Sequence, residues 1–296
     1  MTFNLFELTH KVARELGVVY AGTCTAGSAT TIADTTLSRF DNDYFNKVDK
    51  GTAWILHDAA GAGGAPEGEY GRITDFVSTT GVVTIETLST AVASGDRYAL
   101  VTDQVPLNQI ISSINATIEE YTVPVVNSTA IVIADNQTEY TLPFTHGKLL
   151  KCWYQGDTSD DDDNRWMPMP RGWWEIQTAA AGTADTIRFR HQFSSTHAIM
   201  LEYETNHAPL YNSTHMLHEH VPMPLVVYPA ALDLAWWMKD DTNTDEKDSR
   251  IMKLEQKAAR AQAQYKIEKP KRGNKTWALG GAGYVPDSTV NSVILK

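Results

Sequence analysis

The chain has little cysteine and no long apolar run. Its 296 residues include two cysteines, Cys24 and Cys152, which lie far apart and belong to no CxxC pair. A disulfide or thiolate metal site is therefore not expected, and a reducing compartment of synthesis fits. No run approaches the roughly 20 apolar residues that span a bilayer. The N-terminal segment carries charges at helical spacing, unlike a secretory signal. We expect synthesis in the cytoplasm and no membrane partner.

Positive charge is also scarce. The net charge is -11, which argues against a protein that binds phosphate backbones over its whole surface. The exception is the stretch from Lys239 to Lys275, which contains 11 Lys and Arg but only 7 Asp and Glu. This distribution predicts an acidic body with a mildly basic C-terminal arm, suited to an acidic partner surface.

A glycine-rich stretch, Gly61-Ala62-Gly63-Gly64, has two interpretations. A phosphate-binding loop needs a strand before the glycines and a helix after them. Here Pro66 and Gly68 follow, the next segment alternates like a strand, and the spacing fits neither G-x-G-x-x-G nor the P-loop. The pattern favours a loop that joins two strands.

Helical periodicity occurs at residues 3–16, 104–121 and in two late runs, and short strand-like runs fill the rest. Asp103 is expected to cap the second helix, with Pro106 in its first turn. The predicted fold class is α+β: a helical core with an inserted antiparallel β subdomain, a second β sandwich or barrel-like section and an extended arm. The expected segments are an N-terminal helix (1–17), β-rich insertion (18–102), core helix (103–122), second antiparallel β domain (123–206), His/Pro-rich linker (207–224), αα-hairpin (225–269) and C-terminal arm (270–296).

The strongest metal-like constellation is His215, His218 and His220, with Glu219 between the last two and His207 nearby. Imidazoles at this spacing could bind zinc or iron. Prolines on both sides argue against a helix, and the HExxH order is absent. In an extended linker His218 and His220 would still point the same way. Solvated or interface histidines are the favoured interpretation, and we expect no cofactor.

An aspartate-rich segment contains Asp157, Asp160, Asp161, Asp162 and Asp163. A calcium loop counted from Asp157 would need glycine at its sixth position, where Asp162 stands, and glutamate at its twelfth, where Pro168 stands. That pattern fails, so we expect a solvated hairpin tip.

Aromatic residues gather between positions 153 and 174. They are Trp153, Tyr154, Trp166, Trp173 and Trp174. Core and interface packing explains them most simply, and the alternative is a stacking platform for sugars or single-stranded bases. The sequence contains no G-x-S-x-G motif and suggests no Cys-His pair, so we expect no enzyme.

The tail beyond residue 270 has no helical period but many apolar side chains, more than a solvating tail would carry. We expect it to dock on a partner through these residues: Trp277, Leu279, Tyr284, Val285, Val290, Val293, Ile294 and Leu295.

The phrases that follow the first helix carry a resemblance. They are "AGSATTIADTTLSRFDNDYFNKVDKGTAWIL", "APEGEYGRITDF" and "GVVTIETLSTAVASGDRYAL", before a helix containing "ISSINATIEEY". Their order resembles the head-to-tail connector (adaptor or neck) proteins of tailed bacteriophages. The resemblance covers residues 1–121, and residues 222–296 by architecture alone.

The resemblance implies a structural virion protein. Connector proteins of this kind form a twelve-fold ring that joins the portal to the tail and leaves a channel for DNA. They usually have no catalytic residues. Our hypothesis for the aspartate-rich segment from Asp157 to Asp163 is that it faces this lumen and repels DNA. The implied partners are further copies of the chain, the portal, a tail or tail-completion protein, and DNA that passes without specific binding. The implied location is the portal–tail junction of a virion made in a bacterial cytoplasm. The alternatives are a virion-associated glycan-binding, tail or decoration protein, or a metalloenzyme built on the histidines.

Overall fold

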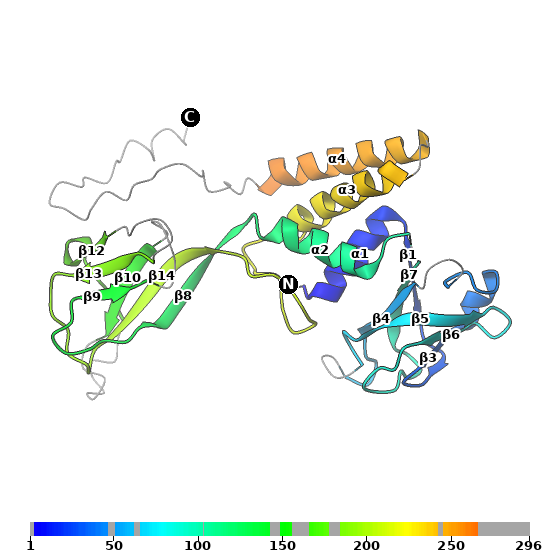
Figure 1. Ribbon diagram of the computed structural model, residues 1–296, viewed down its shortest axis with the longest axis horizontal. Coiled ribbons are helices and arrows are strands. Elements are labelled where there is room, and N and C mark those ends of the chain that lie inside the picture. Colours follow the sequence, from blue (N-terminus) through cyan, green and yellow to red (C-terminus); the bar gives the residue numbers. More distant parts are fainter. Residues whose placement is uncertain are drawn as a thin grey trace. The chain divides into compact units, whose positions relative to one another are not determined.

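The computed structural model divides the chain into two compact units (Figure 1). Among the described residues, unit 1 combines those up to Tyr121 with those from His207 to Tyr265, and unit 2 comprises Thr122–Asn206. The structure describes residues 3–46, 51–61, 66–102, 104–142, 149–155, 166–177, 184–241 and 245–265.

Unit 1 begins with the expected amphipathic helix, α1 (Leu5–Leu16). A capping box starts it: the Asn4 side chain accepts a hydrogen bond from the Glu7 N–H (2.8 Å), and the Glu7 carboxylate accepts one from the Asn4 N–H (3.1 Å). Gly17 ends it with φ +67°, a conformation that glycine adopts without a Cβ penalty. The prediction of a helix here is confirmed.

A seven-stranded antiparallel sheet follows α1. Its strands lie in the order β1-β7-β4-β5-β6-β3-β2, and a 3₁₀ helix, η1 (Thr35–Arg39), follows β3. β4 pairs directly with β5, so the glycine-rich stretch joins two antiparallel strands as predicted; Gly61 is described and residues 62–65 are not. The strands are β1 (Val19–Thr23), β2 (Ala26–Gly27), β3 (Thr31–Ala33), β4 (Thr52–His57), β5 (Tyr70–Val77), β6 (Val82–Ile85) and β7 (Arg97–Val101).

The core of this sheet holds a buried hydrogen-bonded carboxylate. Asp34 accepts hydrogen bonds from the Thr36 N–H (2.8 Å), the Thr36 hydroxyl (2.7 Å) and the Tyr98 hydroxyl (2.7 Å). Burial, and then the bond to Asp34, raise the pKa of Tyr98, so the phenol stays protonated as the donor. Because η1 begins at Asp34 and Tyr98 lies on β7, this network fixes η1 against the sheet.

Three more helices complete unit 1: α2 (Leu107–Ile118), α3 (Pro224–Asp241) and α4 (Asp245–Tyr265). α3 packs against α1, α2 and α4 (Figure 1). Pro106 precedes α2 as its N-cap residue rather than lying in the first turn, and Asp103 lies outside the described residues. The predicted late helical hairpin is confirmed as α3 and α4.

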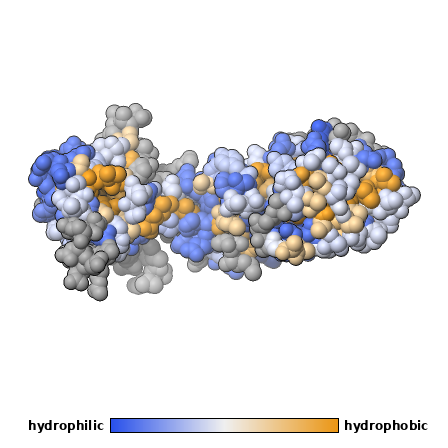
Figure 2. Space-filling view, turned by 90° about the horizontal axis from the view of Figure 1, so that it is seen from below, coloured by the Kyte–Doolittle hydropathy of each residue, from blue (hydrophilic) through white to orange (hydrophobic). Residues whose placement is uncertain are grey.

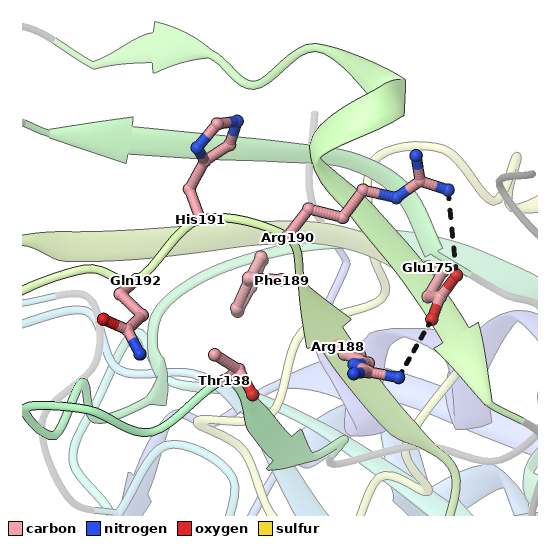
Figure 3. Close-up of a pocket in the computed structure, with 7 residues that line it drawn as sticks. All are labelled: Thr138, Glu175, Arg188, Phe189, Arg190, His191 and Gln192. Carbon is pink, nitrogen blue, oxygen red and sulfur yellow. Dashed lines mark ion pairs between the residues drawn. The ribbon is translucent and has the colours of Figure 1, made fainter. Parts of the chain in front are cut away.

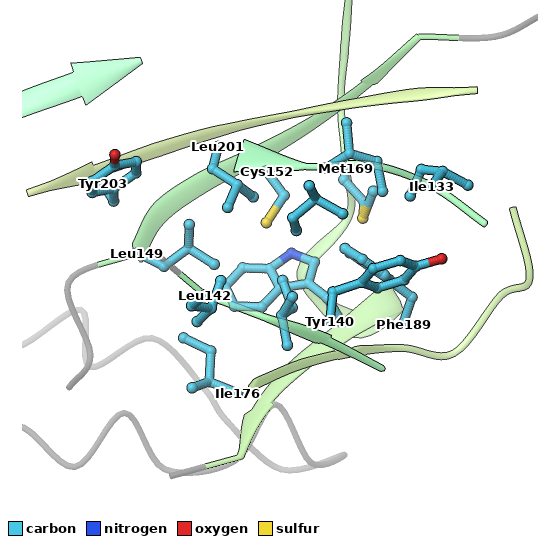
Figure 4. Packing of buried hydrophobic residues seen from close by; sticks show 14 of the residues in the cluster. Ile133, Tyr140, Leu142, Leu149, Cys152, Met169, Ile176, Phe189, Leu201 and Tyr203 are labelled. Carbon is cyan, nitrogen blue, oxygen red and sulfur yellow. The ribbon is translucent and has the colours of Figure 1, made fainter. Parts of the chain in front are cut away.

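Unit 2 is built from two antiparallel sheets, ordered β11-β10-β14-β8 and β12-β13-β9. Apolar side chains of both sheets meet in one core, with Leu149, Cys152 and Leu201 from the first and Ile176 and Phe189 from the second (Figure 4). The strands are β8 (Thr122–Ile131), β9 (Glu139–Thr141), β10 (Leu149–Gln155), β11 (Met167–Pro168), β12 (Trp174–Gln177), β13 (Thr186–Phe189) and β14 (Ala198–Asn206), with a 3₁₀ turn η3 (Arg171–Trp173).

The predicted fold class is wrong in its emphasis on a helical core. The protein is mixed α and β, with four helices and three antiparallel sheets in the described residues, and its strands are more extensive than its helices. The physical reason is where the large side chains lie. Trp54, Tyr98 and Phe76 are fully buried and belong to the seven-stranded sheet. The predicted core helices α1 and α2 are short, with 12 residues each, and contribute smaller side chains such as Leu5 and Ile110 to the interior.

Replacing Tyr98 with Phe should destabilise the protein. The substitution removes a buried donor to the Asp34 carboxylate, which costs about 1–3 kcal/mol of the free energy of unfolding. Urea denaturation followed by circular dichroism measures the loss. Tyr70→Phe is the matched control, because Tyr70 is exposed and its hydroxyl lies outside the Asp34 network. Equal effects of the two substitutions would contradict the role of the buried network.

Candidate functional site

Helix α3 presents two adjacent tryptophans at the surface. Trp236 is 46% exposed and Trp237 45%, and Met252 on α4 is 56% exposed. Upstream residues of the same helix, such as Leu225, Val226 and Ala230, are buried. We call Trp236, Trp237 and Met252 the α3–α4 apolar surface. Large exposed aromatic side chains of this kind mark contacts with other molecules more often than scattered aliphatic residues do.

Other apolar residues are scattered over the surface. In Figure 2, which shows one face of the molecule, apolar residues form separate small patches on a mostly polar surface in each unit. Single exposed apolar residues are normal for a soluble protein and need no partner.

A groove with basic side chains runs along α4 beside the C-terminal end of α1. It is lined by Glu15, Ser249, Arg250, Lys253, Leu254, Gln256, Lys257 and Arg260. The Arg250 guanidinium donates a hydrogen bond to the Leu16 carbonyl, and Lys257 pairs with the Glu15 carboxylate. These two contacts hold α4 against the end of α1, where a cation also interacts favourably with the helix dipole.

The histidines partly come together in unit 1. His207 is buried, donates from Nδ1 to the Ala208 carbonyl (2.6 Å) and accepts the His218 backbone N–H at Nε2 (2.9 Å). This arrangement requires the neutral ring with its proton on Nδ1. The Nδ1 atoms of His218 and His220 lie 3.3 Å apart, as the spacing predicted, while His215 instead accepts the Tyr211 N–H.

These rings do not form a metal site of the usual kind. No group of three or more His, Cys, Asp or Glu side chains among the described residues could hold a metal ion. Both ring nitrogens of His207 form hydrogen bonds within the protein, so this ring cannot bind a metal ion. Of the three neighbouring rings, His218 and His220 remain as two candidate metal ligands. The cluster therefore acts through its hydrogen bonds, which tie residues 207–220 together.

The aromatic residues of unit 2 do not form a single platform. Trp174 is buried in the core, while Trp153 neighbours Lys151, whose amino group lies 5.9 Å from its ring centroid. Tyr154 and Trp173 pack together at the edge of that core, with centroids 5.8 Å apart, and Trp166 is half-buried. Glycan binding by these rings stays a hypothesis.

A polar depression lies next to Trp173 in unit 2. It is lined by Thr138, Glu175, Arg188, Phe189, Arg190, His191 and Gln192. Glu175 stands between the two guanidinium groups, 3.8 Å from Arg188 and 3.9 Å from Arg190 (Figure 3). His191 points away from this ion pair and packs on Trp173. Arg188 also lies 3.6 Å from the Glu139 carboxylate, so two glutamates neutralise the two arginines. The groups are partly exposed, and the depression therefore provides no strong binding chemistry of its own.

Neither cysteine is suited to nucleophilic chemistry. Both are free and buried, and burial raises the pKa of each thiol. A thiol needs a lowered pKa to react as a thiolate near neutral pH. Two predicted sites lie outside the described residues: the aspartate-rich segment from Asp157 to Asp163, and the apolar arm residues from Trp277 to Leu295.

Sequence reasoning missed the polar contacts that join α2 to α3. The Ser113 hydroxyl lies 2.9 Å from an Asp233 carboxylate oxygen and 3.1 Å from the Ala230 carbonyl, and the Tyr121 hydroxyl donates to the Leu225 carbonyl (3.1 Å). The one available signal was Ser113 among the apolar positions of a predicted helix. The partners are more than 100 residues away in sequence, so local patterns could not identify them.

Comparison with known proteins identifies no relative of this chain. No protein-family model matches the sequence, and no curated protein or solved structure matches it significantly. Among the described helices, none has the length and apolar character needed to cross a bilayer.

Acidification should loosen the histidine cluster. Burial, and then the neighbouring His220 and His207, lower the pKa of His218 below its usual 6.5. The unfolded chain then binds the proton more tightly, so the stabilisation is complete above about pH 6.5 and is lost as the pH falls toward the lower folded pKa. Thermal unfolding measured between about pH 7.5 and pH 5 should show this loss.

His218→Asn should flatten that pH dependence, because an amide oxygen can still accept the His220 N–H but does not titrate. His215→Asn, which alters a ring outside the cluster, is the control and should leave the profile unchanged. A wild-type profile in the His218→Asn variant would contradict this account.

Proposed function

We propose that the chain is a structural virion protein that forms a dodecameric ring, connects the portal to the tail and lines the DNA channel. The proposal starts from the resemblance of residues 1–121 to tailed-phage connector proteins. The structural observation that carries it is the exposure of Trp236 and Trp237 on a helix that is apolar from Pro224 to Met238 except at Asp233.

The composition of α3 makes this exposure informative. Asp233 is its only charged residue between Pro224 and Met238, and Asp233 lies against Ser113 of α2. A helix that is apolar on all sides is typical of the interior of a larger structure. α1, α2 and α4 cover much of α3 but leave the two tryptophans accessible. A further protein surface would complete their burial.

A ring needs two different complementary surfaces on each subunit, because its contacts are head-to-tail. The α3–α4 apolar surface supplies aromatic anchors for one of them. The apolar residues of segment 270–296 supply a chain segment that can add to a neighbouring sheet edge or groove. The remaining partners are the portal and a tail protein, and the work of the molecule is assembly rather than catalysis.

Replacing both tryptophans with serine tests the proposal. Trp236→Ser with Trp237→Ser should leave the chain folded, because both side chains are partly exposed and the buried part of α3 is unchanged. Circular dichroism checks this. Incorporation of the variant into particles should fall at least about tenfold, because buried aromatic anchors supply about 2 kcal/mol or more each. Mass spectrometry of purified particles measures the copy number.

The matched control is Val126→Ser with Val132→Ser, which removes two exposed apolar side chains from unit 2. It should be incorporated normally. Incorporation of the tryptophan variant at the wild-type copy number would contradict the assembly role of α3.

A further inference from the structure

The C-terminal part of α4 carries an unusual concentration of positive charge. Residues 249–265 contain four Lys or Arg side chains and a single acidic residue, Glu255, in a chain whose net charge is -11. The other exposed residues between the first and the last of these cations are Met252, Glu255, Gln256 and Ala259. This part of α4 is therefore positively charged in an acidic chain, and positive charge favours contact with polyanions.

The four cations form one line. Arg250, Lys253, Lys257 and Arg260 are spaced by three, four and three residues, which places them on one side of a helix over about 15 Å. The buried residues Ile251, Leu254, Ala258 and Ala261 repeat the same spacing one position later. The basic stripe, as we call the four cations, therefore borders the contact of α4 with the other helices.

Two members of the basic stripe are anchored and two are available. Arg250 and Lys257 bind the end of α1 through the Leu16 carbonyl and the Glu15 carboxylate. Lys253 and Arg260 line the same groove and form no ion pair with any described residue. The anchored pair fixes the stripe on a rigid helix, and the available pair can turn to an external anion.

We propose that the basic stripe of α4 binds the phosphate backbone of double-stranded DNA, independently of base sequence. This rests on the proposed ring, whose channel DNA traverses. The groove contains no aromatic residue, and its only large apolar side chain, Leu254, is buried. Protein interfaces depend on such anchors, whereas phosphate contacts need only Lys, Arg and hydrogen-bond donors. The groove chemistry thus favours DNA over an acidic protein partner.

Fluorescence anisotropy of the full-length chain with a mixed-sequence duplex of about 30 base pairs tests this. Affinity should fall with salt between about 20 mM and 150 mM, with a log–log slope of about -2 to -4 for two to four phosphate contacts. The variant Lys253→Gln with Arg260→Gln should lose about two units of that slope and bind at least about tenfold more weakly at the lowest salt.

The control is Arg72→Gln with Lys151→Gln, which removes the same charge from exposed positions on β5 and β10. It should retain the wild-type slope. The inference is overturned if the wild-type chain does not bind the duplex at the lowest salt, or if the control variant loses as much slope.

The ring proposal is tested separately by the copy number in particles. A normal copy number without duplex binding would overturn the DNA inference and leave the ring standing. Loss of the Lys253→Gln, Arg260→Gln variant from particles without duplex binding would instead assign the groove to an acidic protein surface, which also contradicts the inference.

Discussion

Unit 1 depends on the closure of α3 against α1 and α2. The chain leaves this unit after Tyr121 and returns at His207, so its helices come from segments separated by a whole domain. Apolar packing supplies most of the attraction, and buried hydrogen bonds from Ser113 and Tyr121 fix the register of α2 against α3. α3 supports this packing with a largely apolar sequence, in which Asp233 is the only charged residue between Pro224 and Met238.

The packing of α3 against the other helices also determines which side chains are exposed on unit 1. Although α3 packs against three helices, Trp236 and Trp237 remain accessible in its C-terminal half. α4 covers another side and turns its cations toward the groove beside α1. α3 therefore carries aromatic anchors, and the neighbouring helix α4 carries the basic stripe. In the proposed ring the first binds protein and the second contacts DNA.

Local patterns predicted the elements better than their roles. Leu5, Leu8 and Val12 at helical spacing with Gly17 after them predicted α1, and the i, i+2 spacing of His218 and His220 predicted that they meet. The helical core was overestimated, because periodicity does not show which element buries the largest side chains. Long-range partners such as Arg250 and Leu16, or His207 and His218, depend on tertiary closure that local spacing does not encode.

The central claim is that the chain is a ring component at the portal–tail junction. Quantitative mass spectrometry of purified particles, scaled to the major capsid protein, tests it most directly. The account predicts about twelve copies of the chain per particle, as closed cyclic symmetry of that order requires. A value near zero would contradict a structural role, and many tens of copies would indicate a tail or decoration protein instead of a connector.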